Sequence, residues 1–288
     1  MTSQLPNFLV IGPPKCATTW LYFCLRQHPE IFLPFVRELQ YFDKYYDKGP
    51  EWYERYFNSS GDKKAVGEIT PTYISHDQAA QRIAKDLPGV KIIACFRNPI
   101  ERAYSDFNHQ LKRGTISTDF ETALSANSRH LQGGLYFSQL ESYLKLFSRE
   151  KILVLIYEDI QKDPAVFLKK IFKFLEVDEN FVPENFDKKV LPEELARPLY
   201  FKVAGFSHFL RSKMGLSPLI DGIKKSSLLP FLDKTLHLFG YSNNKKAIVV
   251  DRPAVSMKPE TRAWLADRYR DEIEKLTRFL NRDLSFWV

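Results

Sequence analysis

Short apolar runs alternate with longer segments of helical periodicity along the first 180 residues of the chain. The runs have the length of buried strands: FLVIG (8–12), AVGEI (65–69), VKIIACF (90–96) and KILVLIY (151–157). Apolar residues recur at helical spacing in the segments between them: 74–86, 99–112, 134–147 and 163–175. Uninterrupted apolar strands that alternate with helices are typical of a central parallel sheet covered on both faces. The pattern predicts an α/β fold whose ligands lie at the carboxyl ends of the strands.

Two other parts of the chain have different patterns. The stretch from Ser256 to Trp287 predicts a long amphipathic helix that begins near Pro259 and ends at the NRD sequence. Residues 197–245 contain apolar clusters interrupted by glycine and proline. We expect this segment to form a helical flap within a single domain that spans 1–288, and to cover an acceptor. The alternative is an amphipathic helix that contacts a membrane surface, since basic and apolar residues occur together there.

Composition and charge limit the classes of protein to which the chain can belong. With 44% hydrophobic and 27% charged residues, the 288-residue chain is typical of a soluble globular protein. The formal net charge of +7 favours anionic partners, but no long Lys/Arg run marks a nucleic-acid arm, so no nucleic acid is expected. The three cysteines suit a reducing compartment. No secretory signal or transmembrane segment is visible, and a cytoplasmic location is expected.

The stretch FLVIGPPKCATTWLYFCL (8–25) predicts a strand, a turn and a helix. The free N–H groups and the dipole of such a helix favour a phosphate, to which Lys15 adds a charge and Thr18 and Thr19 add hydroxyls. The triphosphate loop G-x-x-x-x-G-K-[ST] has a second glycine that is absent here, so this shorter loop suits a single 5′ phosphate-type group. Alternatively, Thr18 only caps the helix and Lys15 is a solvated turn residue.

The stretch CFRNPIERAYSDFNH (95–109) is the second candidate site. The preceding strand ends at Arg97, and Pro99 suits the first turn of the next helix. Ser105 follows Arg97 by eight residues, about two helical turns. The two side chains are therefore placed to hold a second phosphate, although Arg97 could instead pair with a carboxylate.

Together these stretches resemble the sulfotransferases that use 3′-phosphoadenosine 5′-phosphosulfate (PAPS). The similarity is greatest to the branch that contains heparan sulfate sulfotransferases and many bacterial members. PKCATT (14–19) matches the family's 5′-phosphosulfate loop, and FRNPIERAYSDFNH (96–109) matches its 3′-phosphate motif. FVRELQYFD (35–43) is similar to the segment with the family's catalytic glutamate, and GEITPTY (67–73) to a further short motif. The resemblance covers roughly 6–180 and 245–288.

The resemblance implies a P-loop-like sulfotransferase fold that transfers a sulfuryl group from PAPS to a hydroxyl or amine of a glycan or small-molecule acceptor, without a metal. It implies that Lys15 stabilises the leaving phosphate and that Glu38 is the general base. The implied donor-binding residues are Lys15, Cys16, Ala17, Thr18, Thr19, Arg97, Ser105, Tyr136 and Arg252.

The sequence departs from the family pattern at three positions. Ala17 replaces the usual glycine, Ile69 stands where glycan-sulfating members commonly have lysine, and Gln40 where some have histidine. The last two changes argue against a heparan-type acceptor. Three interpretations of the chemistry stay open: His28, His76 or His109 as the base, an ATP-dependent small-molecule kinase on a similar loop, and a binding protein without turnover.

Overall fold

The structure is a computed structural model that describes residues 5–125, 128–184, 186–187 and 257–288. These residues belong to one unit, which comprises 1–187 and 249–288. The predicted flap at 197–245 and the predicted donor contact Arg252 lie outside the described residues.

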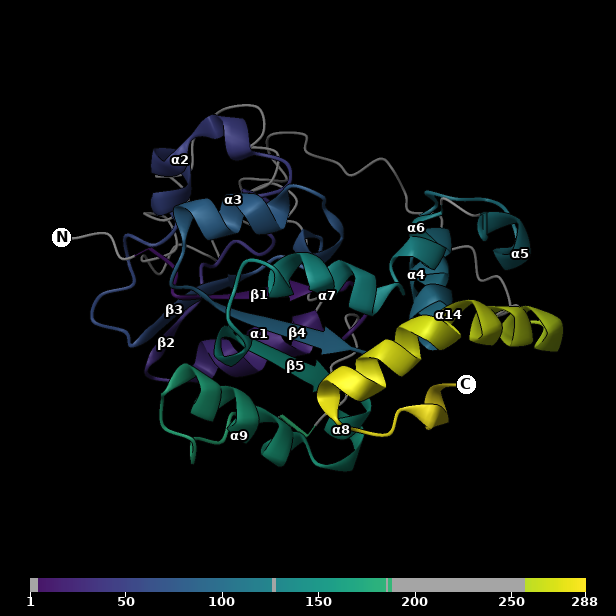
Figure 1. The fold of residues 1–288 in the computed structure, drawn as a ribbon. Coiled ribbons are helices and arrows are strands. Elements are labelled where there is room, and N and C mark those ends of the chain that lie inside the picture. Colours follow the sequence, from purple (N-terminus) through teal and green to yellow (C-terminus); the bar gives the residue numbers. More distant parts are fainter. Residues whose placement is uncertain (1–4, 126–127, 185, 188–256) are drawn as a thin grey trace, which may run out of the picture. The chain divides into compact units, whose positions relative to one another are not determined.

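A parallel sheet forms the centre of the described unit (Figure 1). Its strands among the described residues are β1 (Phe8–Gly12), β2 (Ile31–Phe32), β3 (Ala65–Ile69), β4 (Lys91–Phe96) and β5 (Ile152–Ile156), in the order β2-β3-β1-β4-β5. Every neighbouring pair is parallel. The predicted α/β architecture is therefore confirmed. Because β1 lies between β3 and β4, the loops that follow these three strands meet at one edge of the sheet.

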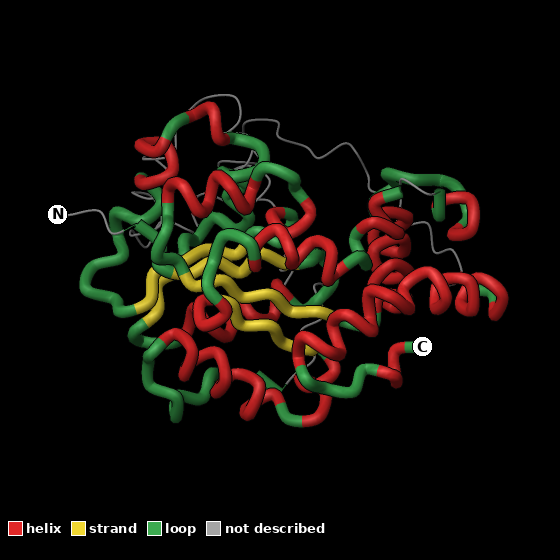
Figure 2. Tube along the Cα trace, in the orientation of Figure 1, coloured by secondary structure: helices red, strands yellow, loops and turns green. Residues whose placement is uncertain are grey.

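The helices connect these strands (Figure 2). The longer ones are α1 (Thr18–Gln27), α3 (Ala79–Asp86), α4 (Pro99–Lys112), α7 (Tyr136–Leu144), α9 (Pro164–Leu175) and α14 (Pro259–Leu280). The short ones are α2 (Pro50–Glu54), α5 (Phe120–Ala123), α6 (Arg129–Gln132) and α8 (Glu158–Lys162), with 3-10 turns η1 (Tyr46–Lys48), η2 (Tyr73–Ser75), η3 (Arg149–Lys151) and η5 (Ser285–Trp287).

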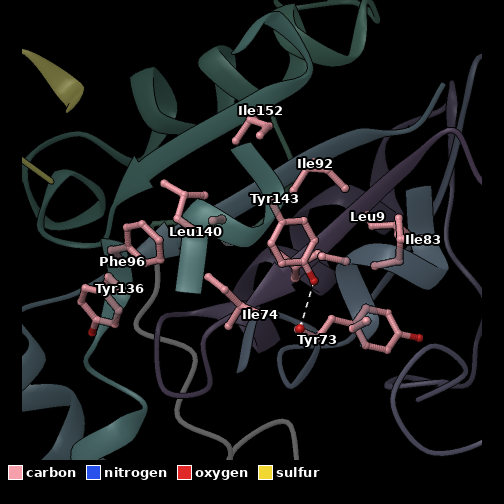
Figure 3. Close-up of a cluster of buried hydrophobic side chains, with 14 of the residues drawn as sticks. Leu9, Tyr73, Ile74, Ile83, Ile92, Phe96, Tyr136, Leu140, Tyr143 and Ile152 are labelled. Atoms are coloured by element: carbon pink, nitrogen blue, oxygen red, sulfur yellow. Dashed lines mark hydrogen bonds between the residues drawn. The ribbon is translucent and has the colours of Figure 1, made fainter. Parts of the chain in front are cut away.

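Successive side chains of a strand point to opposite faces of the sheet, and every residue of β1 and β3 is buried, so both faces are covered. Leu9 and Ile92 pack with α3 and α7, and the Tyr143 hydroxyl donates to the carbonyl of Tyr73 across this cluster at 2.9 Å (Figure 3). The other face packs against α1 and α9, whose Trp20 and Phe167 rings lie 5.9 Å apart. The buried layers on each side fix the strand ends that hold the candidate site.

Local sequence signals set the ends of the two helices that matter most for the site. Asn98 caps α4 by accepting from the N–H groups of Ile100 at 2.9 Å and Glu101 at 3.3 Å, with Pro99 in the first turn as predicted. The C-terminal helix α14 begins at Pro259 and ends at Leu280, and the residue that caps it, Asn281, has a left-handed φ of 47°. Within the described part of the chain, no helix is both long enough and apolar enough to span a bilayer.

Candidate active site

The phosphate loop after β1 has the backbone geometry of an anion site. Lys15 and Ala17 have left-handed φ values of 73° and 62°, while the residues beside them do not. Such alternation turns successive N–H groups toward one side, which forms a concave anion-binding nest. Ala17 is also the N-cap of α1 and has no side-chain acceptor for the first helical amides. The N–H groups of the first turn are therefore available to an anionic ligand.

The loop is supported by residues that face the protein interior. Cys16 is fully buried, and its thiol lies 3.8 Å from the carbonyl of Pro14. Burial raises the pKa of the Cys16 thiol to about 12, so this side chain is a neutral packing group. Gly12 enters the loop with a φ of 113°, and a Cβ atom at this position would lie only 2.1 Å from the carbonyl oxygen of Pro71. The start of the loop thus contacts the GEITPTY segment directly.

Arg97 lies beside the phosphate loop because β4 is the neighbour of β1. Its Nη1 donates to the carbonyl of Lys15 at 3.5 Å, and its guanidinium lies 4.8 Å from the centre of the Tyr157 ring. Tyr136 is buried, stacks on Phe96 at 4.5 Å and donates its hydroxyl to the carbonyl of Arg97 at 2.8 Å. Tyr136 therefore positions the backbone of Arg97 from the protein interior. The predicted contact of Tyr136 with a nucleotide stays a prediction.

One face of α4 lies toward Lys15. Burial lowers the pKa of Lys15; the Asp106 charge opposes this effect, and the charges of Arg97 and Lys112 add to it. Partial desolvation, and then the Lys15 charge, lower the pKa of His109 to about 4. The imidazole of His109 is therefore neutral at pH 7. Half-buried Ser105 is one turn before His109 on the same helical face, so α4 adds a hydroxyl, an imidazole and an ammonium beside the loop.

Asp106 anchors α4 beneath this face. Its carboxylate is buried and lies 3.2 Å from the Nε of Arg129 and 3.1 Å from the Nδ1 of His130. Arg102 lies 4.0 Å away on the same helix. These contacts hold α4 against α6 and thereby fix the position of Ser105.

Glu38 is carried to the phosphate loop by the segment after β2. Glu38 and Gln40 both have a left-handed φ of 54°, and the Glu38 N–H donates to the carbonyl of Ile69 at 3.2 Å. Arg37 donates through Nη2 to the Thr19 hydroxyl of α1 at 2.8 Å, and the same nitrogen is 3.8 Å from the Glu38 carboxylate. The Glu38 side chain is 44% exposed, so it is accessible to an acceptor. The structure thus brings the predicted base and the predicted donor loop together.

A buried carboxylate that the sequence reasoning missed supports the Glu38 segment. Glu68 accepts from the hydroxyls of Tyr53 at 2.8 Å, Tyr73 at 2.8 Å and Thr70 at 2.9 Å. The Tyr73 hydroxyl in turn accepts from the N–H of Tyr41 at 2.9 Å. Burial raises the pKa of Glu68 to about 7, although the three hydroxyl donors oppose this rise. The signal in the sequence was an acidic residue in the middle of the apolar run AVGEI.

Two of the histidines considered as alternative bases, His28 and His76, differ in their hydrogen bonds. His28 is buried between Phe172 and Phe181, with Nε2 2.9 Å from the carbonyl of Asp178 and Nδ1 accepting from the N–H of Glu30 at 3.1 Å. Both ring nitrogens are engaged, so His28 is structural. His76 has a buried Nδ1 without a hydrogen-bond partner among the described residues.

The described ranges contain no group of three side chains suited to a metal ion.

The fold and the loop geometry define a P-loop-like nucleotide-binding α/β protein. A sequence model of the sulfotransferase domain matches residues 5–193, well over half of the chain. The chain therefore belongs to the sulfotransferase family.

Several relatives agree with this assignment. The bifunctional heparan sulfate N-deacetylase/N-sulfotransferase 2 of Homo sapiens is 31% identical over 194 residues, which is 60% of this chain and 22% of the relative. The membrane-associated sulfotransferase kil1 of Dictyostelium discoideum is 39% identical over 111 residues, 38% of this chain and 24% of the relative. The chain thus matches about a fifth to a quarter of the length of these curated relatives.

Solved structures share the fold. A sulfotransferase from Alicyclobacillus acidocaldarius superposes with a TM-score of 0.70 and 22% identity, and the match covers 99% of each chain. Mouse sulfotransferase SULT7A1 complexed with PAP superposes with a TM-score of 0.50 and 17% identity, over 96% of this chain and 88% of that one.

Proposed function

We propose that this protein transfers the sulfuryl group of PAPS to a hydroxyl or amine of a glycan or small-molecule acceptor. The observation that carries the proposal is the left-handed phosphate loop of Lys15 with Arg97 bonded to its carbonyl. A loop that binds one phosphate beside a fixed arginine suits a nucleotide with phosphates at two positions. Membership of the sulfotransferase family supports the proposal, as does a structural neighbour complexed with PAP.

The donor phosphates are assigned to two groups of residues. The N–H groups of 15–19 and the hydroxyls of Thr18 and Thr19 bind the 5′ phosphate, and Arg97 with Ser105 binds the 3′ phosphate. In the transfer, the acceptor oxygen or nitrogen forms a bond to sulfur while the bond from sulfur to the phosphate oxygen breaks. The acceptor proton passes to Glu38, and Lys15 offsets the charge that develops on the leaving bisphosphate.

The acceptor is proposed only as a chemical class. Named relatives include heparan sulfate N-sulfotransferases, which is compatible with a glycan. Ile69 and Gln40 supply no charge beside Glu38, so a neutral glycan or small alcohol suits the site better than a highly sulfated one.

Nucleotide binding tests the donor assignment. Arg97→Ala is expected to weaken adenosine 3′,5′-bisphosphate (PAP) binding by about 1.5–3 kcal/mol, because a charged hydrogen-bond partner of a phosphate is lost. Binding of AMP, which lacks the 3′ phosphate, should change little. Calorimetry with both nucleotides measures this, with Arg55→Ala as a control outside the site. Equal losses for the two nucleotides would contradict the assignment, and Mg·ATP-dependent transfer would support the kinase alternative.

Turnover tests the base. Glu38→Gln keeps the size of the side chain but cannot accept the proton, so the rate of sulfuryl transfer should fall by about 10²–10⁴. PAP affinity should stay within a factor of two, since the donor phosphates are held elsewhere. Labelled PAPS with a competent acceptor gives the rate. Near-normal turnover would assign the base to another group, with His76 and His109 as the next variants.

A further inference from the structure

Arg37 lies between the two halves of the candidate active site. Its Nη2 donates to the hydroxyl of Thr19 in the first turn of α1 at 2.8 Å, and the same nitrogen lies 3.8 Å from the Glu38 carboxylate. A single guanidinium group therefore adjoins both the phosphate loop and the proposed base. In the proposed reaction the sulfuryl group lies between these two elements.

The protein holds the Arg37 guanidinium in place. It lies 5.3 Å from the centre of the Tyr22 ring, and this ring is buried. The Tyr22 hydroxyl is 3.1 Å from the carbonyl oxygens of both Pro34 and Phe35, which attaches the segment before Arg37 to α1. The cation–π contact and the anchored backbone fix the position of the positive charge.

The Arg37 guanidinium has a buried donor that the described residues leave without a partner. Among the described residues Nη2 has a hydrogen-bond partner, whereas the buried Nε has none. The side chain is only 20% exposed, so solvent offers limited compensation. A guanidinium that is largely removed from water with a free donor is suited to an anionic group.

We propose that Arg37 contacts the oxygens of the transferring sulfuryl group and is a further catalytic residue; this proposal rests on the proposed function. In the in-line transfer the charge is spread over the equatorial oxygens, and Lys15 is placed on the side of the leaving phosphate. Arg37 is placed on the side of the acceptor, where a planar fork of donors stabilises these oxygens. Because the Thr19 oxygen accepts from Arg37, the Thr19 O–H is directed away from it and toward the 5′ phosphate.

The contrast between PAP and PAPS gives a readout that a structural role would not produce. PAP lacks the sulfuryl group, so Arg37→Ala should change its Kd less than threefold. The same variant should lower kcat for PAPS turnover by about 10²–10³, as expected when a donor to developing charge is removed. Added guanidinium ion should restore part of the lost rate. Arg37→Lys, which keeps the charge but loses the fork, should have an intermediate kcat.

Arg26→Ala is the matched control. Arg26 lies 5.8 Å from the centre of the same Tyr22 ring and donates to its hydroxyl at 3.2 Å, but the structure gives it no contact with Thr19 or Glu38. Its kcat should stay within a factor of three of the wild-type value. Thermal unfolding of each variant shows whether the fold is intact.

The outcomes separate this proposal from the proposed function. If the wild-type protein neither binds PAP nor turns over PAPS, the proposed function is wrong. If the wild-type protein is active and folded Arg37→Ala keeps a normal kcat, the Arg37 proposal alone is wrong. A parallel loss of PAP affinity and kcat would also overturn it, because Arg37 would then bind the nucleotide rather than the sulfuryl group.

Discussion

Gly12, at the start of the phosphate loop, and Gly49, outside the site, both have a positive φ but differ in the space around them. Gly12 has a φ of 113° and a Cβ there would lie 2.1 Å from the Pro71 oxygen, whereas Gly49 has a φ of 77° and nothing within 4 Å of such a Cβ. Alanine at either position has an unfavourable backbone conformation, which costs about 1–3 kcal/mol. Only Gly12→Ala adds a clash with a backbone atom.

We therefore expect Gly12→Ala to reduce the free energy of unfolding by at least about 2 kcal/mol more than Gly49→Ala does, because the backbone at Pro71 or the phosphate loop has to move. PAP affinity should fall with Gly12→Ala and stay unchanged with Gly49→Ala. Urea unfolding and calorimetry measure the two effects. Equal destabilisation by both substitutions would mean that the contact with Pro71 relaxes freely.

Glu68 makes stability depend on pH. Its pKa is raised by burial from an ordinary value of 4.5 to about 7. A group whose pKa is higher in the folded state binds its proton more tightly there, so its stabilising contribution is fully present below pH 4.5 and is lost as the pH rises through 7. Glu68→Gln has no proton to lose and keeps the neutral state at all these pH values.

The difference in unfolding free energy between Glu68→Gln and the wild type should therefore shift in favour of the variant by up to about 3 kcal/mol between pH 4.5 and pH 8. Urea unfolding at several pH values gives this difference. The contributions of the other titrating groups are the same in both proteins and cancel. The exposed pair partner Glu141, 3.2 Å from Lys145, provides a control as Glu141→Gln. A pH-independent difference for Glu68→Gln would show that the three hydroxyl donors hold the carboxylate ionised.

At the scale of elements, sequence periodicity predicted most of the fold. The predicted segment 99–112 is α4 (Pro99–Lys112), because Asn98 and Pro99 are strong start signals next to a regular apolar face. The predicted segment 74–86 divides into η2 (Tyr73–Ser75) and α3 (Ala79–Asp86) instead. The 3-10 turn places Tyr73 against the buried Glu68, and this tertiary contact has no local signal.

Short elements were not predicted because they are too brief to show a period. Strand β2 contains two residues, and α5 and α6 four each. The two helices have cap signals that could have been read: Asp119 accepts from the N–H of Thr122 at 2.7 Å, and Ser128 from that of Leu131 at 3.3 Å.

The sequence predicted only those parts of the candidate site that directly follow a strand of the sheet. Lys15 and Arg97 meet because each follows a parallel strand, and the ends of such strands share one edge of the sheet. The contacts of Arg37 and Glu68 depend instead on how the segments after β2 and β3 pack, which periodicity does not encode. Local patterns located the phosphate loop, and only tertiary packing revealed the residues that position the base.

At the scale of the whole molecule, the site is tied to the C-terminal segment. The Asn98 amide donates to the carbonyl of Trp287 at 2.9 Å, directly beside Arg97. Arg282 forms two hydrogen bonds of 2.6 Å with the carboxylate of Asp159, which lies just after β5. The carboxyl ends of β4 and β5 are thus held by residues nearly two hundred and more than a hundred positions later in the chain. The amphipathic pattern of α14 predicted a helix. It did not predict where that helix packs, because the contacts that fix its C-terminal end are to residues far away in the sequence.

The formal net charge of +7 raises the question of whether the donor is attracted by the whole protein or by a few local cations. Lys112 and Arg113 stand at the C-terminal end of α4, three and four residues after His109. Burial is the main cause of the lowered pKa values of Lys15 and His109, and the charges of Lys112 and Arg113, respectively, add to it. Lys173 lies at the other end of the sheet: its neighbour Phe174 accepts from the ammonium of Lys91, the first residue of β4. A strand of this length separates the two ends by about 16 Å, which exceeds the Debye length of about 10 Å at 0.1 M salt.

Lys112→Gln with Arg113→Gln should therefore weaken PAP binding by about tenfold at 0.05 M salt, because a multiply charged nucleotide loses two nearby cations. Lys169 precedes Lys173 by about one turn of α9. Lys169→Gln with Lys173→Gln lowers the net charge equally, from +7 to +5, and should change the Kd by less than a factor of two. At 0.5 M salt the difference between the two double variants should largely disappear, since the remaining interactions are screened. Calorimetry on the wild type and both double variants at the two salt concentrations gives the six dissociation constants. Equal weakening by the two pairs would show that the overall charge, and not the α4 face, attracts the donor.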